Sequence, residues 1–376
     1  MASVTRRGTS TLITIFSELE EPRKPGMCEH PLINIVMIAL LAVLCGAEGW
    51  EDFTDFGETR EAWLGEFLDL SAGIPSADTF RRVFERIKPE AFSTCLRRIV
   101  ENLAEHARAQ GKSTQIAIDG KTLRHAFRKA GGLAALHLVH AWCVQSKLLL
   151  AQKATEAKSN EITAIPALLD ILELDGVTVT SDAMGCQRDI SQKIVDAKGD
   201  YVIALKDNQP RLAADVEEAF EALATVPKLP AKVSQTSESN KGHGRVEGRT
   251  VTAMPVPPVL QEQHHWPGLK SLVRVQSIRV VGEQRSEEFR YYISSRKPDA
   301  KAQADIIRAH WGVENQLHWI LDVALHEDDN KIASRNGAEN FALLRRTALT
   351  LLSRYKGSKR GIRAKQKIAC WSQQAL

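Results

Sequence analysis

The sequence predicts an α/β protein in which a helical N-terminal domain precedes a mixed β-sheet. Three observations support this prediction. Helical periodicity and turn residues dominate up to about residue 111. From residue 115 to residue 205, strand and helix patterns follow in the order three strands, helix, strand, helix, strand. The composition, 43% hydrophobic and 26% charged over 376 residues, is that of an ordinary globular protein with two or three domains.

Residues 1–110 are predicted to form a helical accessory domain. The most apolar run, residues 32–47, is about as long as the shortest membrane spans, but Asn34 interrupts it and acidic residues follow directly. We therefore interpret this run as a buried helix and expect no membrane partner. No catalytic cluster occurs in this region. Helices are predicted over residues 32–45, 59–70, 77–87 and 90–109, with Ser76 and Pro89 marking two of the starts.

Residues 111–330 carry the predicted sheet. The order of its first elements is the ribonuclease H-like arrangement, in which an antiparallel meander of three strands is joined by two parallel strands through helical crossovers. The predicted strands are 115–118, 136–144, 148–153, 177–180 and 201–205, and the predicted helices are 160–174 and 187–197.

A β-rich insertion is predicted at about residues 208–297, because this stretch is too long for a simple connection. It contains a polar, glycine-rich piece at 234–248 and strand patterns at 250–255, 272–281 and 289–294. After Pro298, a single helix is predicted to run to about Leu325.

Two aspartates close predicted strands at one edge of the sheet. Asp119 follows the first strand and Asp182 the fourth, and in an open sheet ligand-binding groups gather outside the carboxyl ends of parallel strands. A third acid must then come from the helix after the last strand, where Glu314, Asp322 and Glu327 are available. Three carboxylates suit two divalent cations, Mg²⁺ or Mn²⁺, which assist phosphodiester chemistry. Singly, an aspartate at a strand end is often only a turn residue.

Three longer motifs contain these acids. They read Ile116-Ala-Ile-Asp-Gly-Lys-Thr-Leu-Arg124, Thr180-Ser-Asp-Ala-Met-Gly-Cys-Gln187 and His310-Trp-Gly-Val-Glu-Asn-Gln-Leu-His-Trp-Ile-Leu-Asp-Val323. Through them the sequence resembles the DDE transposases of bacterial insertion sequences, most closely the H-repeat-associated group. The resemblance covers nearly the whole chain. It implies a ribonuclease H-like catalytic domain, DNA strand-transfer chemistry and a metal-binding triad of Asp119, Asp182 and Glu314, in which Asp119 would bridge the two ions.

The sequence departs from many insertion-sequence relatives around Glu314. Those relatives place Tyr and Arg seven and four residues before the helix Glu, and Lys seven residues after it, where they contact the cut DNA end. Here Ile307, His310 and Leu321 occupy these positions. The resemblance therefore implies the metal site but not the way in which the DNA end is handled.

The helix around Glu314 offers a second interpretation. His310, Glu314 and His318 recur every fourth position and could hold zinc, but the strand-end acids would then lack a role. We prefer a helix face that is hydrogen-bonded to its surroundings, with Glu314 alone at the metal. Trp311 and Trp319 could stack on a flipped or terminal base, although aromatic residues on such helices usually belong to the core. We expect the core for Trp319 and leave Trp311 open.

Positive charge is concentrated near the C-terminus. Between Arg335 and Lys367 ten basic residues stand against one acid, which gives +9 in a chain of net charge +4 and leaves −5 for the rest. Clustered cations favour a polyanionic partner through counterion release, with a solvated tail as an equal alternative. Residues 331–376 are thus predicted to be a basic helical region that grips DNA. Candidate DNA contacts along the chain are Lys121, Arg124, Lys206, Arg245, Arg345, Arg346, Lys359, Arg360 and Arg363.

These observations predict a transposase acting on double-stranded DNA, both insertion-sequence ends and target DNA, as a homodimer in the DNA complex. One alternative is a nuclease of the same fold that hydrolyses DNA without strand transfer. Another is a catalytically inactive, DNA-binding remnant. Six scattered cysteines without a C-x-x-C pair, and an N-terminus unlike a signal peptide, favour the cytoplasm.

Overall fold

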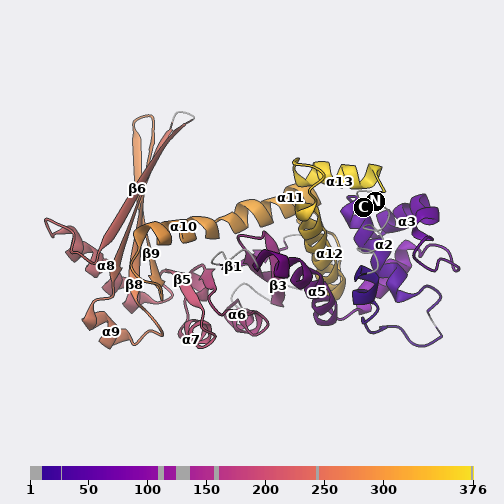
Figure 1. Ribbon diagram of the computed structural model, residues 1–376, viewed down its shortest axis with the longest axis horizontal. Coiled ribbons are helices and arrows are strands. Elements are labelled where there is room, and N and C mark those ends of the chain that lie inside the picture. Colours follow the sequence, from indigo (N-terminus) through magenta and orange to yellow (C-terminus); the bar gives the residue numbers. More distant parts are fainter. Residues whose placement is uncertain are drawn as a thin grey trace.

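The structure is a computed structural model. It describes residues 11–26, 28–108, 114–123, 136–155, 161–242, 245–373 and 376. At one end of the molecule lie the N-terminal helices, and at the other a long β-arm projects from the central sheet (Figure 1).

Four helices make up most of the N-terminal region, namely α2 (Leu32–Leu44), α3 (Trp50–Leu64), α4 (Ala77–Arg86) and α5 (Pro89–Arg108). Three of them agree with the prediction, but the helix predicted at 59–70 is wrong, since α3 begins nine positions earlier. Its start is set by Asp52, whose carboxylate accepts the backbone N–H groups of Gly49 at 3.0 Å and Glu48 at 2.6 Å. That cap satisfies donors that a helix start otherwise leaves open.

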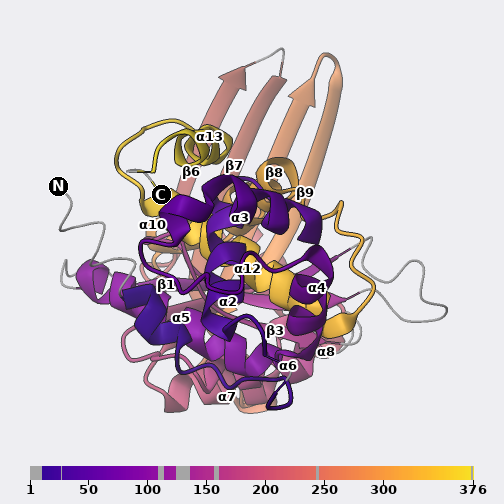
Figure 2. The ribbon, with the colours of Figure 1, turned by 90° about the vertical axis from the view of Figure 1, so that its right-hand side faces the viewer.

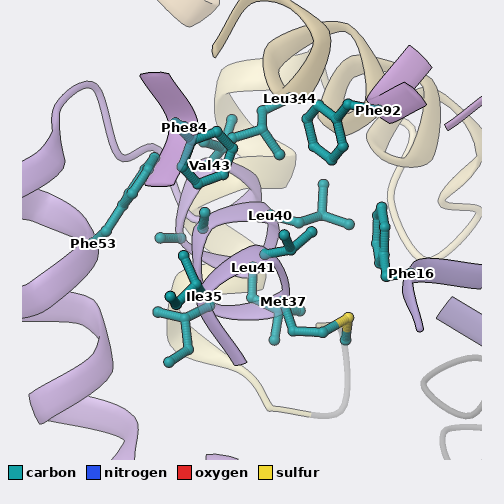
Figure 3. Packing of buried hydrophobic residues seen from close by; sticks show 14 of the residues in the cluster. Phe16, Ile35, Met37, Leu40, Leu41, Val43, Phe53, Phe84, Phe92 and Leu344 are labelled. Atoms are coloured by element: carbon teal, nitrogen blue, oxygen red, sulfur yellow. The ribbon is translucent and has the colours of Figure 1, made fainter. Parts of the chain in front are cut away.

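Helix α2 forms the centre of the N-terminal core. Twelve of its thirteen residues are buried, and Figure 3 shows phenylalanines from several elements around its side chains. The same core takes in Phe341, Leu344 and Leu352 of α12 (Arg335–Arg354). The prediction of a buried helix at 32–47 is therefore confirmed. In the described part of the chain, no helix is both long and apolar enough to cross a membrane.

A single nine-stranded sheet runs through the centre of the molecule in the order β3-β2-β1-β4-β5-β9-β8-β7-β6. Strands β1 (Gln115–Thr122), β2 (His137–Cys143) and β3 (Leu148–Thr155) form the antiparallel meander, and β4 (Thr178–Ser181) and β5 (Asp200–Leu205) join in parallel. Helices α6 (Glu161–Leu169) and α7 (Arg188–Asp196) make the crossovers. This is the predicted ribonuclease H-like arrangement.

The insertion continues the same sheet instead of folding apart from it. Strand β9 (Gln284–Ser294) pairs antiparallel with β5, and β8 (Ser271–Val281), β7 (Arg245–Pro255) and β6 (Ser234–Gly242) follow outward. The outer ends of these four strands form the projecting arm (Figures 1 and 2). The polar, glycine-rich piece at 234–248 contains β6 and the start of β7, and these two segments pair with each other in regular antiparallel register. Helices α8 (Pro210–Ala224) and α9 (Pro258–His264), which were not predicted, also belong to the insertion.

Helices cover both faces of the sheet. On one face α6, α7 and α8 pack over β1, β4 and β5. On the other lies α10 (Ala300–His310), followed by a π-helical turn η3 (Glu314–His318), α11 (Trp319–Leu325) and, beside the N-terminal helices, α12. The single α-helix predicted after Pro298 is thus interrupted at Glu314. The chain continues through α13 (Ile362–Trp371).

Candidate active site

Asp119 and Asp182 lie side by side at the edge where the parallel pairing of β1 and β4 stops. The last parallel pair is Ile118 with Ser181, and the two aspartates follow it directly. Strand β1 itself continues to Thr122 through its pairing with β2, so Asp119 lies inside a strand and not after one. Adjacent strands hold the two carboxylates together although 63 positions separate them in the chain.

One oxygen of each aspartate accepts a backbone hydrogen bond. Asp119 Oδ1 accepts the N–H of Gly120 at 2.9 Å, and Asp182 Oδ1 accepts the N–H of Met184 at 3.0 Å, where a short 3₁₀ turn begins. These bonds restrict rotation of both carboxylates. A carboxylate has about four acceptor positions, so each side chain is still able to bind a cation.

Glu314 begins the π-helical turn and has an exposed side chain. Its carboxylate interacts electrostatically with Asp119. Burial, followed by the Asp182 carboxylate, raises the pKa of Asp119 to about 7, and Glu314 and Glu161 act in the same direction. Such a cluster of like charges favours a divalent cation, because a cation relieves the repulsion.

The donor chemistry of this edge fits a hard divalent cation. Carboxylate oxygens are the ligands that Mg²⁺ and Mn²⁺ prefer. Over the ranges that the structure describes, no three His, Cys, Asp or Glu side chains already enclose a metal position. The two aspartates are held at the sheet edge by backbone hydrogen bonds, whereas Glu314 has an exposed side chain on η3.

Comparison with known proteins identifies the family of this chain. A model described as "Transposase DDE domain" matches residues 110–351, and one described as "DDE_Tnp_1-associated" matches residues 13–100. The chain belongs to the DDE transposase family. The resemblance inferred from the three motifs is thereby confirmed.

Full-length relatives of this transposase-family chain occur in Escherichia coli. The "H repeat-associated putative transposase YhhI" of strain K12 is 40% identical over 97% of this chain and 96% of its own length. The "Putative transposase YncI" of strain O157:H7 is 40% identical over 95% and 91%, respectively. Among solved structures, a piggyBac transposase synaptic complex with hairpin DNA covers 96% of this chain and 75% of its own, with 12% identity and a TM-score of 0.43.

Three of the predicted DNA contacts are wrong, because the structure buries them. Lys121 is 8% exposed, and its amine pairs with Asp322 and lies 3.2 Å from Glu327 Oε2. Arg346, 2% exposed, forms a bidentate pair with Glu327 at 2.6 and 3.1 Å. Arg345, 1% exposed, stacks on Phe341. The sequence pattern predicted phosphate ligands at these positions, but the fold uses the three cations inside the protein.

The other predicted DNA contacts lie at the surface or outside the described residues. Arg124 lies outside the described residues. Exposed side chains belong to Lys206, Arg245, Lys359, Arg360 and Arg363. They remain predictions, with exposure as their support.

The three residues around Glu314 that differ from many insertion-sequence relatives pack against other parts of the protein. Ile307 is 6% exposed and Leu321 is fully buried, so both belong to the core. His310 Nδ1 lies 2.9 Å from Thr180 Oγ1, and burial lowers the pKa of His310 to about 4. The His310 ring therefore interacts with Thr180 of β4, which argues against a role of His310 as a zinc ligand. The expectation of a buried Trp319 is wrong, since it is 58% exposed; Trp311 is 37% exposed.

Two groups behind the aspartates were not predicted from the sequence. His140 lies opposite Asp119 in the β1–β2 register, and Glu161 is buried at the start of α6, with its Oε1 2.6 Å from His137 Nε2. The sequence contained a signal, because two histidines interrupt the apolar run at 136–144, and the strand that it forms is buried in all seven residues. Polar residues in such a strand need partners.

Gly120 is the residue that allows β1 and α6 to approach each other. A Cβ at this position would lie 2.5 Å from both Glu161 Oε1 and His137 Nε2. We expect Gly120→Ala to lower the free energy of unfolding by about 1–3 kcal/mol through overpacking, as measured by urea denaturation. Gly242→Ala, where no atom lies within 4 Å, is the matched control and is expected to change it by less than about 0.5 kcal/mol. Equal effects of the two substitutions would show that close approach at Gly120 is unimportant.

Proposed function

We propose that this chain cleaves DNA at the ends of its insertion sequence and joins the freed 3′-hydroxyl to target DNA. The observation that carries the proposal is the pairing of Asp119 and Asp182 at one sheet edge, in electrostatic contact with Glu314. Membership of the DDE transposase family supports it.

In this proposal Asp119, Asp182 and Glu314 hold two divalent cations, Mg²⁺ or Mn²⁺. When bound, the cations would activate the attacking oxygen and stabilise charge on the leaving oxygen of the phosphodiester. The protein itself contributes the positions of the three carboxylates. Backbone N–H groups orient the two aspartates, and the exposed Glu314 carboxylate completes the set from the helical segment after α10.

The DNA partner is double-stranded, and the contacts to it are made by exposed cations. Lys359, Arg360 and Arg363 lie at and just before α13, where acidic residues are absent between positions 340 and 376. Lys206 follows β5 and Arg245 begins β7 on the arm. A homodimer, in which two such molecules hold two DNA ends, belongs to the same proposal.

Removing the charges at α13 tests the proposed DNA interface. We expect the triple variant Lys359→Ala, Arg360→Ala and Arg363→Ala to weaken DNA binding. The slope of log K against log salt should fall in magnitude by about 0.9 for each phosphate that the variant no longer neutralises. Fluorescence anisotropy over a salt series measures both. The matched control replaces the exposed Lys228, Lys232 and Lys270 by alanine and should leave the slope near that of the unaltered protein.

The function itself is tested with paired DNA ends. The substrate carries the inverted repeats that flank the reading frame, and the products formed with Mg²⁺ or Mn²⁺ are separated on a gel. Joined products support the proposal. Nicks without joining would show that the protein is a nuclease and not a transposase. DNA binding without cleavage would show that it is an inactive remnant.

A further inference from the structure

We propose that His318 is a positioning residue for Asp119, and that a one-way chain of hydrogen bonds starting at Arg346 makes its Nδ1 the donor. Two hydrogen bonds make up this chain, one from Arg346 Nε to His140 Nε2 and one from His140 Nδ1 to His318 Nε2, and they leave His318 Nδ1 facing Asp119 Oδ2. The inference rests on the proposed function insofar as Asp119 is taken to hold a cation.

Arg346, on α12, holds the start of this chain of hydrogen bonds in the protein interior. Glu327, fully buried, accepts two hydrogen bonds from Arg346, whose Nη1 also donates to the carbonyl of Ala342 at 2.9 Å. These bonds fix the plane of the guanidinium. Its Nε–H points to β2 and donates to His140 Nε2 at 3.0 Å.

The direction of the chain follows from what each group is able to donate. A guanidinium has donors and no acceptor, so His140 Nε2 must accept and carries no proton. A neutral imidazole then holds its proton on Nδ1. His140 Nδ1 lies 3.3 Å from His318 Nε2 and donates to it. By the same logic His318 carries its own proton on Nδ1.

That final donor faces the candidate metal ligand. His318 Nδ1 lies 3.5 Å from Asp119 Oδ2, while Asp119 Oδ1 accepts the Gly120 N–H. Each carboxylate oxygen therefore has a protein donor beside it and a lone pair to spare. A donor held in this way fixes the orientation of a ligating carboxylate, and groups that orient metal ligands govern metal affinity.

The π-helical turn explains how one short segment provides both Glu314 at the sheet edge and His318 beside Asp119. Glu314 and His318 are its first and last residues. One supplies an acid to the sheet edge, and the other reaches into the interior toward β2, where it is 14% exposed. Turns of this kind, which insert a residue into a helix, are frequent at functional sites.

The first test reads the tautomers directly. Nitrogen-15 NMR of metal-free protein with labelled histidine should show His140 and His318 neutral with the proton on Nδ1, the minor form of free imidazole side chains. His140→Gln and His318→Asn assign the two signals. A proton on Nε2 of His318, or a doubly protonated ring, would overturn the inference. This readout needs neither DNA nor a cation.

The second test measures Mn²⁺ binding by the free-ion EPR signal. His318→Ala is expected to weaken Mn²⁺ binding about 10- to 100-fold. His318→Asn, whose amide nitrogen takes the place of Nδ1, is expected to restore it. His265→Asn, at an exposed site just after α9, is the control. Equal affinity of His318→Ala and wild type, or an Asn variant as weak as Ala, would contradict the inference. Failure of the unaltered protein to bind Mn²⁺ would instead contradict the proposed function.

Discussion

Asp182→Asn is expected to reduce DNA cleavage by at least about 10²–10³-fold, the range seen when one electrostatic contribution to a transition state is removed. The amide keeps the shape of the side chain and its acceptor for the Met184 N–H, but it removes one negative charge from the proposed cation site. DNA binding should persist, because the cations proposed to contact phosphates lie elsewhere on the surface. Cleavage of labelled ends and anisotropy with the same DNA measure the two effects.

The same substitution is expected to have the opposite effect on stability. The Asp182 carboxylate is one cause of the raised pKa of Asp119, so the two carboxylates repel each other and we expect the Asp182 charge to destabilise the metal-free fold. Removing it should raise the free energy of unfolding without metal by about 1 kcal/mol and reduce the gain on adding Mg²⁺. Asp175→Asn, at an exposed position in the turn before β4, is the control and should change neither activity nor stability. Full cleavage activity of Asp182→Asn would exclude our assignment of the site.

Arg346→Met is expected to lower the free energy of unfolding by about 3–5 kcal/mol, the cost of leaving one charge of a buried pair behind. Glu327 would keep Lys121, whose amine lies 3.2 Å away, as a close partner. Urea denaturation measures the loss. Replacing both partners, as Arg346→Met with Glu327→Leu, should recover part of it because no charge is then stranded.

The matched control for this prediction is an exposed pair. Arg81 pairs with Asp78 on the surface of α4, and Arg81→Met should cost no more than about 1 kcal/mol. A similar loss at both positions would show that the Arg346 pair is no more than a surface contact in its energetics.

The pH dependence of the same pair has a defined sign. Burial alone would raise the pKa of Glu327, but Arg346 and Lys121 hold it below its ordinary value of 4.5. A carboxyl with a lowered pKa in the folded state contributes stability that is present above its unfolded pKa. We therefore expect this stability to be lost as the pH falls below about 4.5, and the pH dependence to weaken in the doubly substituted protein.

The strands and the two aspartates could be predicted because they depend on local patterns and on chain order. Alternating or continuous apolar runs marked β1 to β5, and the ribonuclease H-like order then placed Asp119 beside Asp182. The helix around Glu314 was predicted, but its π-helical turn was not, since a change of one residue per turn leaves no clear mark on periodicity. The capping of α3 by Asp52 was missed for a similar reason, because one side chain shifted the start of the helix.

By itself, the sequence determined the order of the strands, the edge at which the acids meet and the family to which the chain belongs. Only the tertiary structure decided which of the charged side chains on α12 are exposed and which are buried. Read as a segment, residues 335–367 form a basic stretch fit for DNA. In the fold, α12 lies between the N-terminal core and the sheet, so Arg345 and Arg346 are buried on its two sides. A charge is exposed or buried according to partners that are distant in the chain, such as Glu48 for Arg345 and His140 for Arg346, and no local pattern records them.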